Sequence, residues 1–208
     1  MKIQLIRHGM TQGNKEKRYI GTINESILPE ERSYLENHRN EYAQEAVEYL
    51  YVSPMLRCME TAEALYPQVP YELVSDLREC DFGDFENHNY IELSEDPDYQ
   101  RWIDSKGTLP FPNGERIEDF KKRSVRGIQN CIEKALKENY QSIAFLVHGG
   151  TIMAVMEEMA VATKENCSKD YFQWQVRNLE GYYGEVQVLT SKKGSSYKIN
   201  SFQKKERI

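Results

Sequence analysis

The 208-residue sequence lacks the features that mark membrane, secreted and disulfide-stabilised proteins. Its mean hydropathy is −0.73 and it contains no long apolar run, so we expect no transmembrane helix. The apolar stretch within residues 1–7 is too short for a signal peptide and indicates an early strand instead. The cysteines show no paired short spacing, which indicates neither a disulfide framework nor a zinc site. They are Cys58, Cys80, Cys131 and Cys167. We therefore expect reduced thiols and a cytoplasmic protein.

The sequence also lacks a prominent basic block. The formal net charge is −6, and the one locally basic segment, residues 204–207, is expected to be a solvated end of the chain. This composition argues against a surface that binds nucleic acid. The four histidines are dispersed and do not cluster with carboxylates at ligand spacings, so a binuclear metal centre is not expected.

What the sequence does contain is an alternation of strand and helix patterns. Residues 142–147 form a continuous apolar run, typical of a strand buried on both faces. Ser53 and Pro54 are suited to the N-cap and first position of a helix. The expected strands are 2–7, 48–52, 71–75 and 142–147, the expected helices are 55–65, 115–139 and 151–162, and a hairpin joins 185–190 to 197–201 around residues 192–195.

This alternation predicts an α/β fold with a mostly parallel central sheet covered on both sides by helices. Hydrophobic residues make up 39% of the chain, enough to bury a core at this length, and we expect one domain over residues 1–208. Residues 85–113 contain three prolines and several aromatic residues without a persistent period. We expect them to form a small, partly helical lid inserted into that domain.

Polar residues follow predicted strands at points that should meet at one edge of the sheet. Arg7 and His8 end the first strand, Arg57 lies shortly after the second, and His148 follows the buried strand. Ligands of such sheets bind beyond the carboxyl ends of the strands. A neutral imidazole can attack phosphorus, and each arginine can donate two N–H groups to phosphate oxygens. Glu79 is in place to protonate a leaving oxygen.

Four motifs spread over residues 3–154 carry a more specific signal. They are Arg7-His8-Gly9-Met10-Thr11-Gln12-Gly13-Asn14 with Gly21, then Ser53-Pro54-Met55-Leu56-Arg57-Cys58-Met59-Glu60-Thr61-Ala62, then Leu77-Arg78-Glu79-Cys80-Asp81-Phe82-Gly83-Asp84-Phe85-Glu86, and finally Val147-His148-Gly149-Gly150-Thr151. Their order and content resemble the histidine phosphatase superfamily, the phosphoglycerate-mutase-like proteins.

The resemblance implies a three-layer α/β/α sandwich and a role for each matched position. His8 would accept the phosphoryl group and Glu79 would be the general acid, without a metal or other cofactor. The residues implied to bind the phosphoryl oxygens or line the phosphate site are Arg7, Thr11, Asn14, Gly21, Arg57, His148 and Gly149. Either histidine alone would be read as an ordinary strand-end residue, and the two arginines favour catalysis. For Thr11 and Asn14, capping of a turn remains an alternative.

Two positions and one segment depart from the family pattern. Met10 occupies a place usually held by glutamate, and Asn87 one usually held by glycine. Residues 23–35 follow the family's pattern only loosely. These departures concern substrate contacts and loop shape, and none removes a reacting group.

Two enzyme branches and one non-enzymatic class fit the motifs. Mutases of the family usually carry an arginine pair for the substrate carboxylate, and residues 85–113 contain none. Asp81, two residues beyond Glu79, would repel a carboxylate. The phosphatase branch is therefore favoured over a cofactor-dependent phosphoglycerate mutase. An inactive phosphate-recognising module is disfavoured because every reacting residue is present.

Within the phosphatase branch, the stretch from Trp102 through Phe111, Glu115 and Arg123 resembles α-ribazole phosphatases, and its Pro-x-Gly-Glu part also occurs in broad-specificity phosphatases. The lid aromatics Tyr90, Trp102 and Phe111 either stack on a flat leaving group or form the core of the lid itself. We expect a small phosphorylated metabolite as substrate, no nucleic-acid or membrane partner, and a monomer or homodimer.

Overall fold

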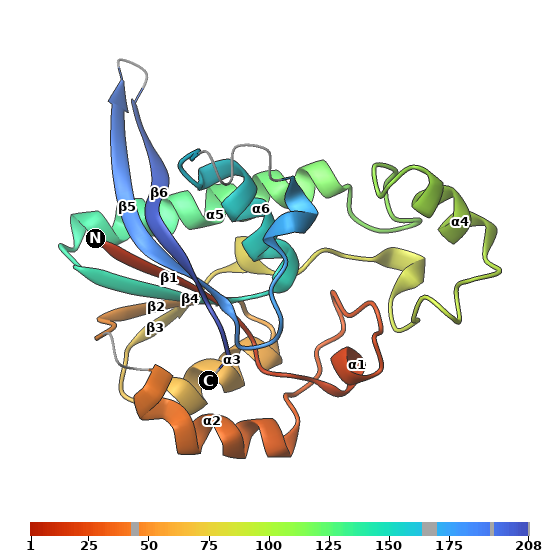
Figure 1. Ribbon diagram of the computed structural model, residues 1–208, viewed down its shortest axis with the longest axis horizontal. Coiled ribbons are helices and arrows are strands. Elements are labelled where there is room, and N and C mark those ends of the chain that lie inside the picture. Colours follow the sequence, from red (N-terminus) through yellow and green to blue (C-terminus); the bar gives the residue numbers. More distant parts are fainter. Residues whose placement is uncertain (43–45, 164–169, 192–193, 208) are drawn as a thin grey trace.

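The computed structural model of the protein describes residues 1–42, 46–163, 170–191 and 194–207. Its centre is a six-stranded sheet in the order β3-β2-β4-β1-β5-β6 (Figure 1). The strands are β1 (Lys2–Arg7), β2 (Tyr49–Val52), β3 (Tyr71–Leu73), β4 (Ser142–Val147), β5 (Gly181–Ser191) and β6 (Gly194–Lys205).

The first four strands are parallel and the last two are antiparallel. β4 pairs in parallel with both β1 and β2, and β2 pairs in parallel with β3. In the register of β1 and β4, Arg7 lies opposite Val147, so the residues that follow these strands emerge side by side. β5 and β6 continue the sheet as a hairpin. Both strands extend beyond the alternating residues 185–190 and 197–201, so the hairpin is longer than the sequence pattern predicts. Residues 192 and 193 of its expected turn lie outside the described residues.

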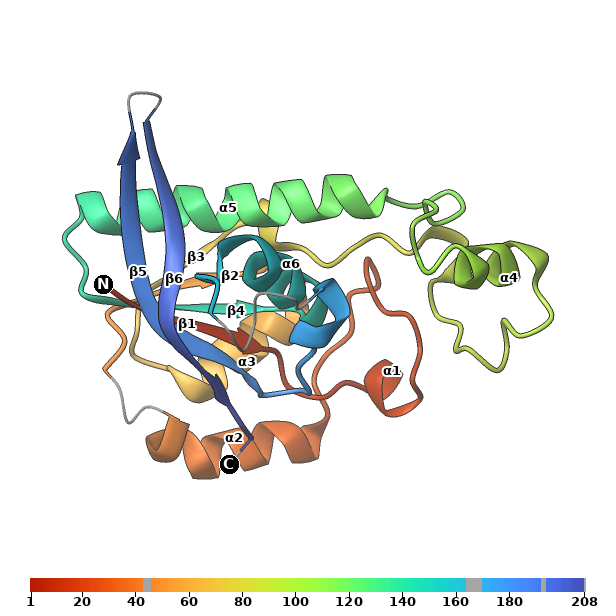
Figure 2. The same cartoon turned by 45° about the horizontal axis from the view of Figure 1, so that its top comes forward.

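Helices cover both faces of the sheet, which confirms the predicted three-layer α/β/α class (Figure 2). On one face, α5 and α6 pack on Ile143 and Phe145, and on the other, α2 and α3 pack on Ala144 and Leu146. Every residue of β4 is buried, as its continuous apolar run predicts. The helices are α1 (Gln12–Lys15), α2 (Pro29–Tyr42), α3 (Leu56–Leu65), α4 (Pro97–Asp104), α5 (Ile117–Lys137) and α6 (Gly149–Met159), with 3₁₀ turns η1 (Ser75–Leu77), η2 (Gly83–Phe85) and η3 (Tyr171–Trp174).

Two local predictions are wrong. Ser53 and Pro54 do not start a helix: α3 begins at Leu56 after Met55, whose side chain makes no capping bond. The Ser53 hydroxyl is bound elsewhere, to His148, as described below. The basic end of the chain is also more than a solvated tail, because Arg207 forms a bidentate ion pair with the buried Glu31 of α2.

The segment 85–113 is partly helical, as expected. Asp96 caps α4 by accepting hydrogen bonds from the backbone N–H groups of Asp98 and Tyr99, and Pro97 holds the first helical position. The lid packs around a largely aromatic cluster to which it contributes Phe85, Leu93, Tyr99 and Phe111, and α5 contributes Phe120. Tyr90 is 52% exposed and lies outside this cluster. Among the helices of the described residues, none is long and apolar enough to cross a membrane.

Candidate active site

His8 follows β1 and is held by both its backbone and its ring. Its backbone N–H donates to the carbonyl of Val147 at 3.0 Å, and its ring Nδ1 lies 2.7 Å from the carbonyl of Gly9. A carbonyl only accepts, so Nδ1 carries the hydrogen and Nε2 keeps its lone pair. Burial, followed by the charges of Arg57 and Arg7, lowers the pKa of His8 well below its ordinary value. The ring is therefore a neutral imidazole with Nε2 available as a nucleophile.

His148 follows β4 and lies beside His8, as the strand register requires. The two ring centroids are 5.2 Å apart, nearly edge to face. His148 Nε2 shares a 2.7 Å hydrogen bond with Ser53 Oγ and lies 3.6 Å from the sulfur of Cys58. Burial and then Arg57 lower the pKa of His148 well below its usual range. Ser53 is thus a site residue that the sequence pattern assigned to a helix cap.

Arg57 is fully buried in the first turn of α3 and is held by backbone carbonyls. Its terminal nitrogens donate to Ile23 at 2.8 Å and to Gly21 at 3.0 Å. Gly21 thus orients Arg57 through its carbonyl, and a Cβ at this position would overlap the carbonyl of Cys80. The loop approaches so closely that only glycine fits.

Arg7 is anchored in a similar way. One terminal nitrogen donates to the carbonyl of Val176 at 2.8 Å. The Nε groups of Arg7 and Arg57 are both buried without a hydrogen-bond partner among the described residues. Such a buried N–H group is costly unless a ligand accepts its hydrogen bond, and an anionic oxygen is the strongest acceptor available. Two such donors beside the His8 ring suit the oxygens of a phosphoryl group.

Glu79 lies just after η1 and faces the start of α6. Its carboxylate oxygens accept from the backbone N–H of Cys80 at 3.0 Å and of Gly150 at 3.2 Å. Burial raises the pKa of Glu79, although these two bonds and the nearby arginines oppose the shift. A Cβ on Gly150 would overlap Glu79 Oε1, so the second glycine of the His-Gly-Gly motif leaves room for the acid. A carboxyl group that keeps its proton can act as a general acid.

Thr11 and Asn14 form a capping box at the start of α1, so the capping interpretation applies to both side chains. Asn14 also lines the cavity beside Arg7. Its Oδ1 accepts a 2.9 Å hydrogen bond from Asn178 Nδ2, which leaves Asn14 Nδ2 as the outward donor. Gly149 begins α6, and a Cβ there would meet the Arg7 guanidinium at an ordinary contact of 3.5 Å.

Asn178 is a site residue that sequence reasoning missed. It is buried, and its Nδ2 donates both to Asn14 and, at 3.0 Å, to the backbone carbonyl of His8. It follows η3, in a segment without a recognisable pattern, and reaches the site only because β5 pairs with β1. No local signal in the sequence could have identified it.

A model of the histidine phosphatase superfamily (branch 1) matches residues 3–188 of this sequence. The chain belongs to the histidine phosphatase superfamily.

Named relatives of this superfamily member are distant. It is 26% identical over 160 residues to a Hydrogenobacter thermophilus protein provisionally named phosphoserine phosphatase 2, covering 74% of this chain and 76% of the relative. It is 24% identical over 200 residues to adenosylcobalamin/α-ribazole phosphatase of Escherichia coli, covering 92% and 97%. The crystal structure of an α-ribazole phosphatase from Shigella flexneri superposes with a TM-score of 0.74 at 21% identity, covering 96% and 95%, and supports the fold.

Beside Arg7 and Asn14 of this superfamily member lies a cavity of about 290 Å³. Its polar wall includes Arg7, Asn14, Arg18, Glu79 and Gln175. The apolar wall comprises Tyr19, Phe82, Trp102, Phe111, Met153 and Phe172. Phe111 therefore belongs both to the core of the lid and to the cavity, while Tyr90 does not line it. We call this space the aromatic cavity, and both Arg7 and Glu79 border it.

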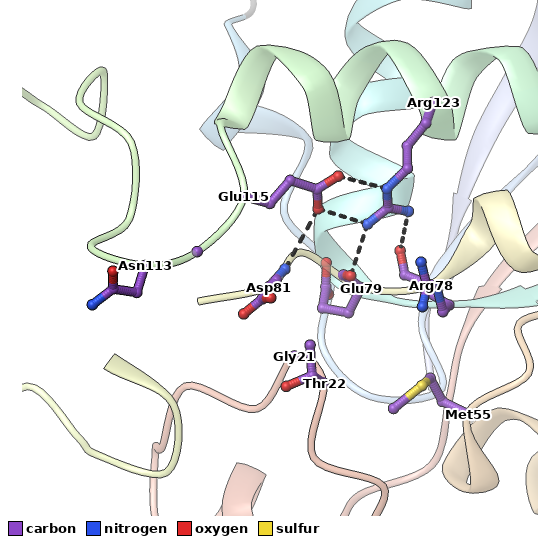
Figure 3. A pocket seen from close by; sticks show the side chains of 10 residues that line it. Gly21, Thr22, Met55, Arg78, Glu79, Asp81, Asn113, Glu115 and Arg123 are labelled. Carbon is purple, nitrogen blue, oxygen red and sulfur yellow. Dashed lines mark hydrogen bonds and ion pairs between the residues drawn. The ribbon is translucent and has the colours of Figure 1, made fainter. Parts of the chain in front are cut away.

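Asp81 does not line the aromatic cavity. Its Oδ1 accepts from the backbone N–H of Gly83 at 2.9 Å, and it borders a neighbouring cavity of about 310 Å³ with Gly21, Thr22 and Arg78 (Figure 3). The repulsion that the sequence suggested between Asp81 and a substrate carboxylate therefore applies to this neighbouring cavity.

Metal-binding groups do not gather here. Within residues 1–42, 46–163, 170–191 and 194–207, no three His, Cys, Asp or Glu side chains could jointly hold a metal ion.

Proposed function

We propose that this protein is a metal-independent phosphomonoesterase that acts through a phosphohistidine at His8. The observation that carries the proposal is the neutral His8 imidazole, whose free Nε2 lies beside two arginines with unpaired, buried Nε donors. Arginine donors fixed in position stabilise the charge that develops on the phosphoryl oxygens during transfer. A complete set of reacting groups also argues against an inactive phosphate-recognising module.

The first step transfers the phosphoryl group to the enzyme. His8 Nε2 attacks phosphorus, the bond from phosphorus to the alcohol oxygen breaks, and Glu79 gives that oxygen its proton. The positive charge that forms on the His8 ring is offset by the Gly9 carbonyl, which accepts from Nδ1 at 2.7 Å.

The second step releases phosphate. Glu79, now a carboxylate, takes a proton from water, and the resulting oxygen attacks the phosphorus of the phosphohistidine. The bond to Nε2 breaks, and the electron pair returns to the His8 ring. Each group ends in its starting protonation state, and no metal is required.

For the substrate, we propose a small phosphate ester whose leaving group bears a planar base, such as α-ribazole 5′-phosphate. The aromatic cavity beside Glu79 is the structural support, because stacking on Trp102 and Phe111 suits a flat ring. Trp102 Nε1 is buried without a partner among the described residues and can donate to an acceptor on that ring. The relative named adenosylcobalamin/α-ribazole phosphatase supports the same choice.

A cofactor-dependent phosphoglycerate mutase is the alternative. Such an enzyme must hold a phospho-acid by its carboxylate and return the phosphoryl group before water reacts. Besides Arg7, the cavity lining includes Arg18, whose guanidinium is already paired with Glu16 and Glu92. Residues 85–113 contain one arginine, the exposed Arg101, rather than a pair. Net hydrolysis is therefore favoured.

We also propose that the protein works in the cytoplasm as a monomer or homodimer. Three of its cysteines, Cys58, Cys80 and Cys131, are buried and unpaired. Cys167 lies outside the described residues.

The test compares phosphate release with mutase turnover. Phosphate release from α-ribazole 5′-phosphate should exceed interconversion of 2- and 3-phosphoglycerate, even with 2,3-bisphosphoglycerate supplied. Trp102→Ala should raise KM for α-ribazole 5′-phosphate about 10-fold, the loss of about 1.4 kcal/mol expected for an aromatic contact, and should change KM for small phosphates less. Tyr90→Ala, a lid aromatic away from the cavity, is the matched control and should leave both values unchanged. Faster mutase turnover would overturn the branch, and equal KM shifts in Trp102→Ala would remove only the stacking.

A further inference from the structure

The guanidinium of Arg123, on α5, uses all of its donors within the protein. Nε and one terminal nitrogen each donate to a different carboxylate oxygen of Glu115 at 2.7 Å. The same terminal nitrogen donates to the carbonyl of Glu79 at 2.9 Å, and the other donates to the carbonyls of Asp76 at 3.0 Å and Arg78 at 2.8 Å. Figure 3 shows the bonds from Arg123 to Glu115, Glu79 and Arg78. With five bonds in place, Arg123 has no donor left for a substrate.

The three carbonyls that Arg123 holds all belong to the turn that carries Glu79. This turn comprises η1 and the two residues after it, and it follows the three-residue strand β3. Its own backbone bonds are few, with Leu77 bonded to Val74 and Arg78 to Ser75. Carbonyls at the end of a 3₁₀ turn need external donors, and Arg123 supplies them.

Glu115 accepts two hydrogen bonds from the Arg123 guanidinium and lies close to the backbone that follows Glu79 and Cys80. Its Oε2 is 3.5 Å from the backbone N–H of Asp81. The side chains of Arg123 and Glu115 are only 15% and 21% exposed, so solvent screens their ion pair less than a surface pair. Together they hold the backbone on both sides of Glu79.

We propose that Arg123 and Glu115 are positioning residues that place the general acid Glu79, rather than residues that contact the substrate. The inference rests on the proposed function, since it assigns Glu79 the proton transfer. The Glu79 carboxylate must lie within hydrogen-bond reach of the leaving oxygen, and a shift of about 1 Å in such a group can cost on the order of 10²-fold in rate. Loss of the clamp formed by Arg123 and Glu115 should therefore impair the acid more than the nucleophile.

The experiment is a double-mutant cycle between Arg123→Gln and Glu79→Gln with two substrates. Glycerol 2-phosphate has a poor leaving group that needs protonation, whereas p-nitrophenyl phosphate needs little. Arg123→Gln alone should lower kcat for glycerol 2-phosphate on the order of 10²-fold and for p-nitrophenyl phosphate by less than about threefold. In the Glu79→Gln background, Arg123→Gln should cost less than about threefold further on either substrate, because the acid it places is already absent.

Arg126→Gln is the matched control, because Arg126 lies one turn away on α5 and, among the described residues, its guanidinium bonds the Asp76 side chain alone. It should leave the ratio of the two rates at the wild-type value. Arg123→Lys and Glu115→Gln provide further variants in case Arg123→Gln does not fold, and each is assayed below its measured Tm.

Equal losses on both substrates in a folded clamp variant, or losses that multiply with Glu79→Gln, would overturn the clamp and leave a purely structural ion pair. An equal loss on both substrates in Glu79→Gln itself would instead contradict the proposed acid. The two failures are therefore distinguishable.

Discussion

At the scale of single residues, one physical cause prepares both reacting groups. Burial disfavours the charged form of each, so it lowers the pKa of His8 and raises the pKa of Glu79. The imidazole stays neutral and nucleophilic, while the carboxyl group keeps a proton to donate. Two titratable groups driven in opposite directions in one site are the arrangement expected of a base or nucleophile paired with an acid.

These directions predict a bell-shaped pH dependence of activity. Because its pKa is lowered, His8 gains its proton only at a pH below its ordinary pKa of 6.5. Because its pKa is raised, Glu79 loses its proton only at a pH above its ordinary pKa of 4.5. Activity should fall on the acidic side as His8 gains a proton and on the alkaline side as Glu79 loses one. Glu79→Gln should lower kcat about 10²–10⁴-fold for an alkyl phosphate and flatten the alkaline limb. The measurement is the pH dependence of kcat for both proteins on one substrate, so that the ionisation of the substrate cancels. An unchanged alkaline limb in Glu79→Gln would assign it to another group.

The site residues that sequence reasoning misassigned or missed share a property. Ser53 has the sequence context of a helix cap, yet its hydroxyl bonds His148, 95 residues away. Asn178 bonds the His8 carbonyl from 170 residues away. Contacts of this range depend on how strands pair, which a local pattern does not encode. Arg7, His8, Arg57 and His148 were predictable because they follow strands or begin helices at the edge where ligands of parallel sheets bind.

At the scale of elements, the buried strands were predicted best. The bounds of β1 and β4 agree with their apolar patterns, and their register brings His8 beside His148. α2 was missed because its sequence is largely charged and buries only Glu31, Leu35 and Tyr42, which is a weak helical pattern. The hairpin of β5 and β6 was predicted too short because glycine and polar residues outside the alternating segments, such as Gly181 and Gly184, interrupt the strand pattern, although ladder pairing holds them in the strands.

The start of α6 provides a prediction at this scale. A Cβ on Gly150 would overlap the Glu79 carboxylate, whereas one on Gly149 would meet only an ordinary contact with Arg7. Gly150→Ala should therefore displace the acid and lower kcat on the order of 10²-fold for an alkyl phosphate, with a smaller loss for p-nitrophenyl phosphate. Gly149→Ala, its neighbour on the same turn, should lose at least tenfold less. Steady-state rates of both variants at equal folded concentration test this, and similar losses in the two would show that the helix start, not Glu79, is what matters.

At the scale of the whole molecule, the sheet positions the proposed nucleophile and α5 holds the turn that carries the proposed acid. His8 and His148 emerge from β1 and β4, while Arg123 ties the turn that carries Glu79 to the helix that follows the lid. The lid places Trp102 and Phe111 over the resulting cavity. The three-layer class followed from the alternation of strands and helices, but the division of the lid aromatics between core and cavity did not, because both environments favour the same side chains.

The most direct test of the account is chemical trapping of the phosphorylated enzyme. The protein is exposed briefly to substrate in the presence of a chelator and without added metal, quenched with base, and its phosphorylated peptide is mapped by mass spectrometry. We predict an acid-labile, base-stable phosphate on His8, no label and no measurable turnover in His8→Ala, and full labelling in His38→Ala, a histidine bonded only within α2. A wild-type protein that hydrolyses substrate without labelling His8, or a His8→Ala variant with near wild-type turnover, would contradict the mechanism.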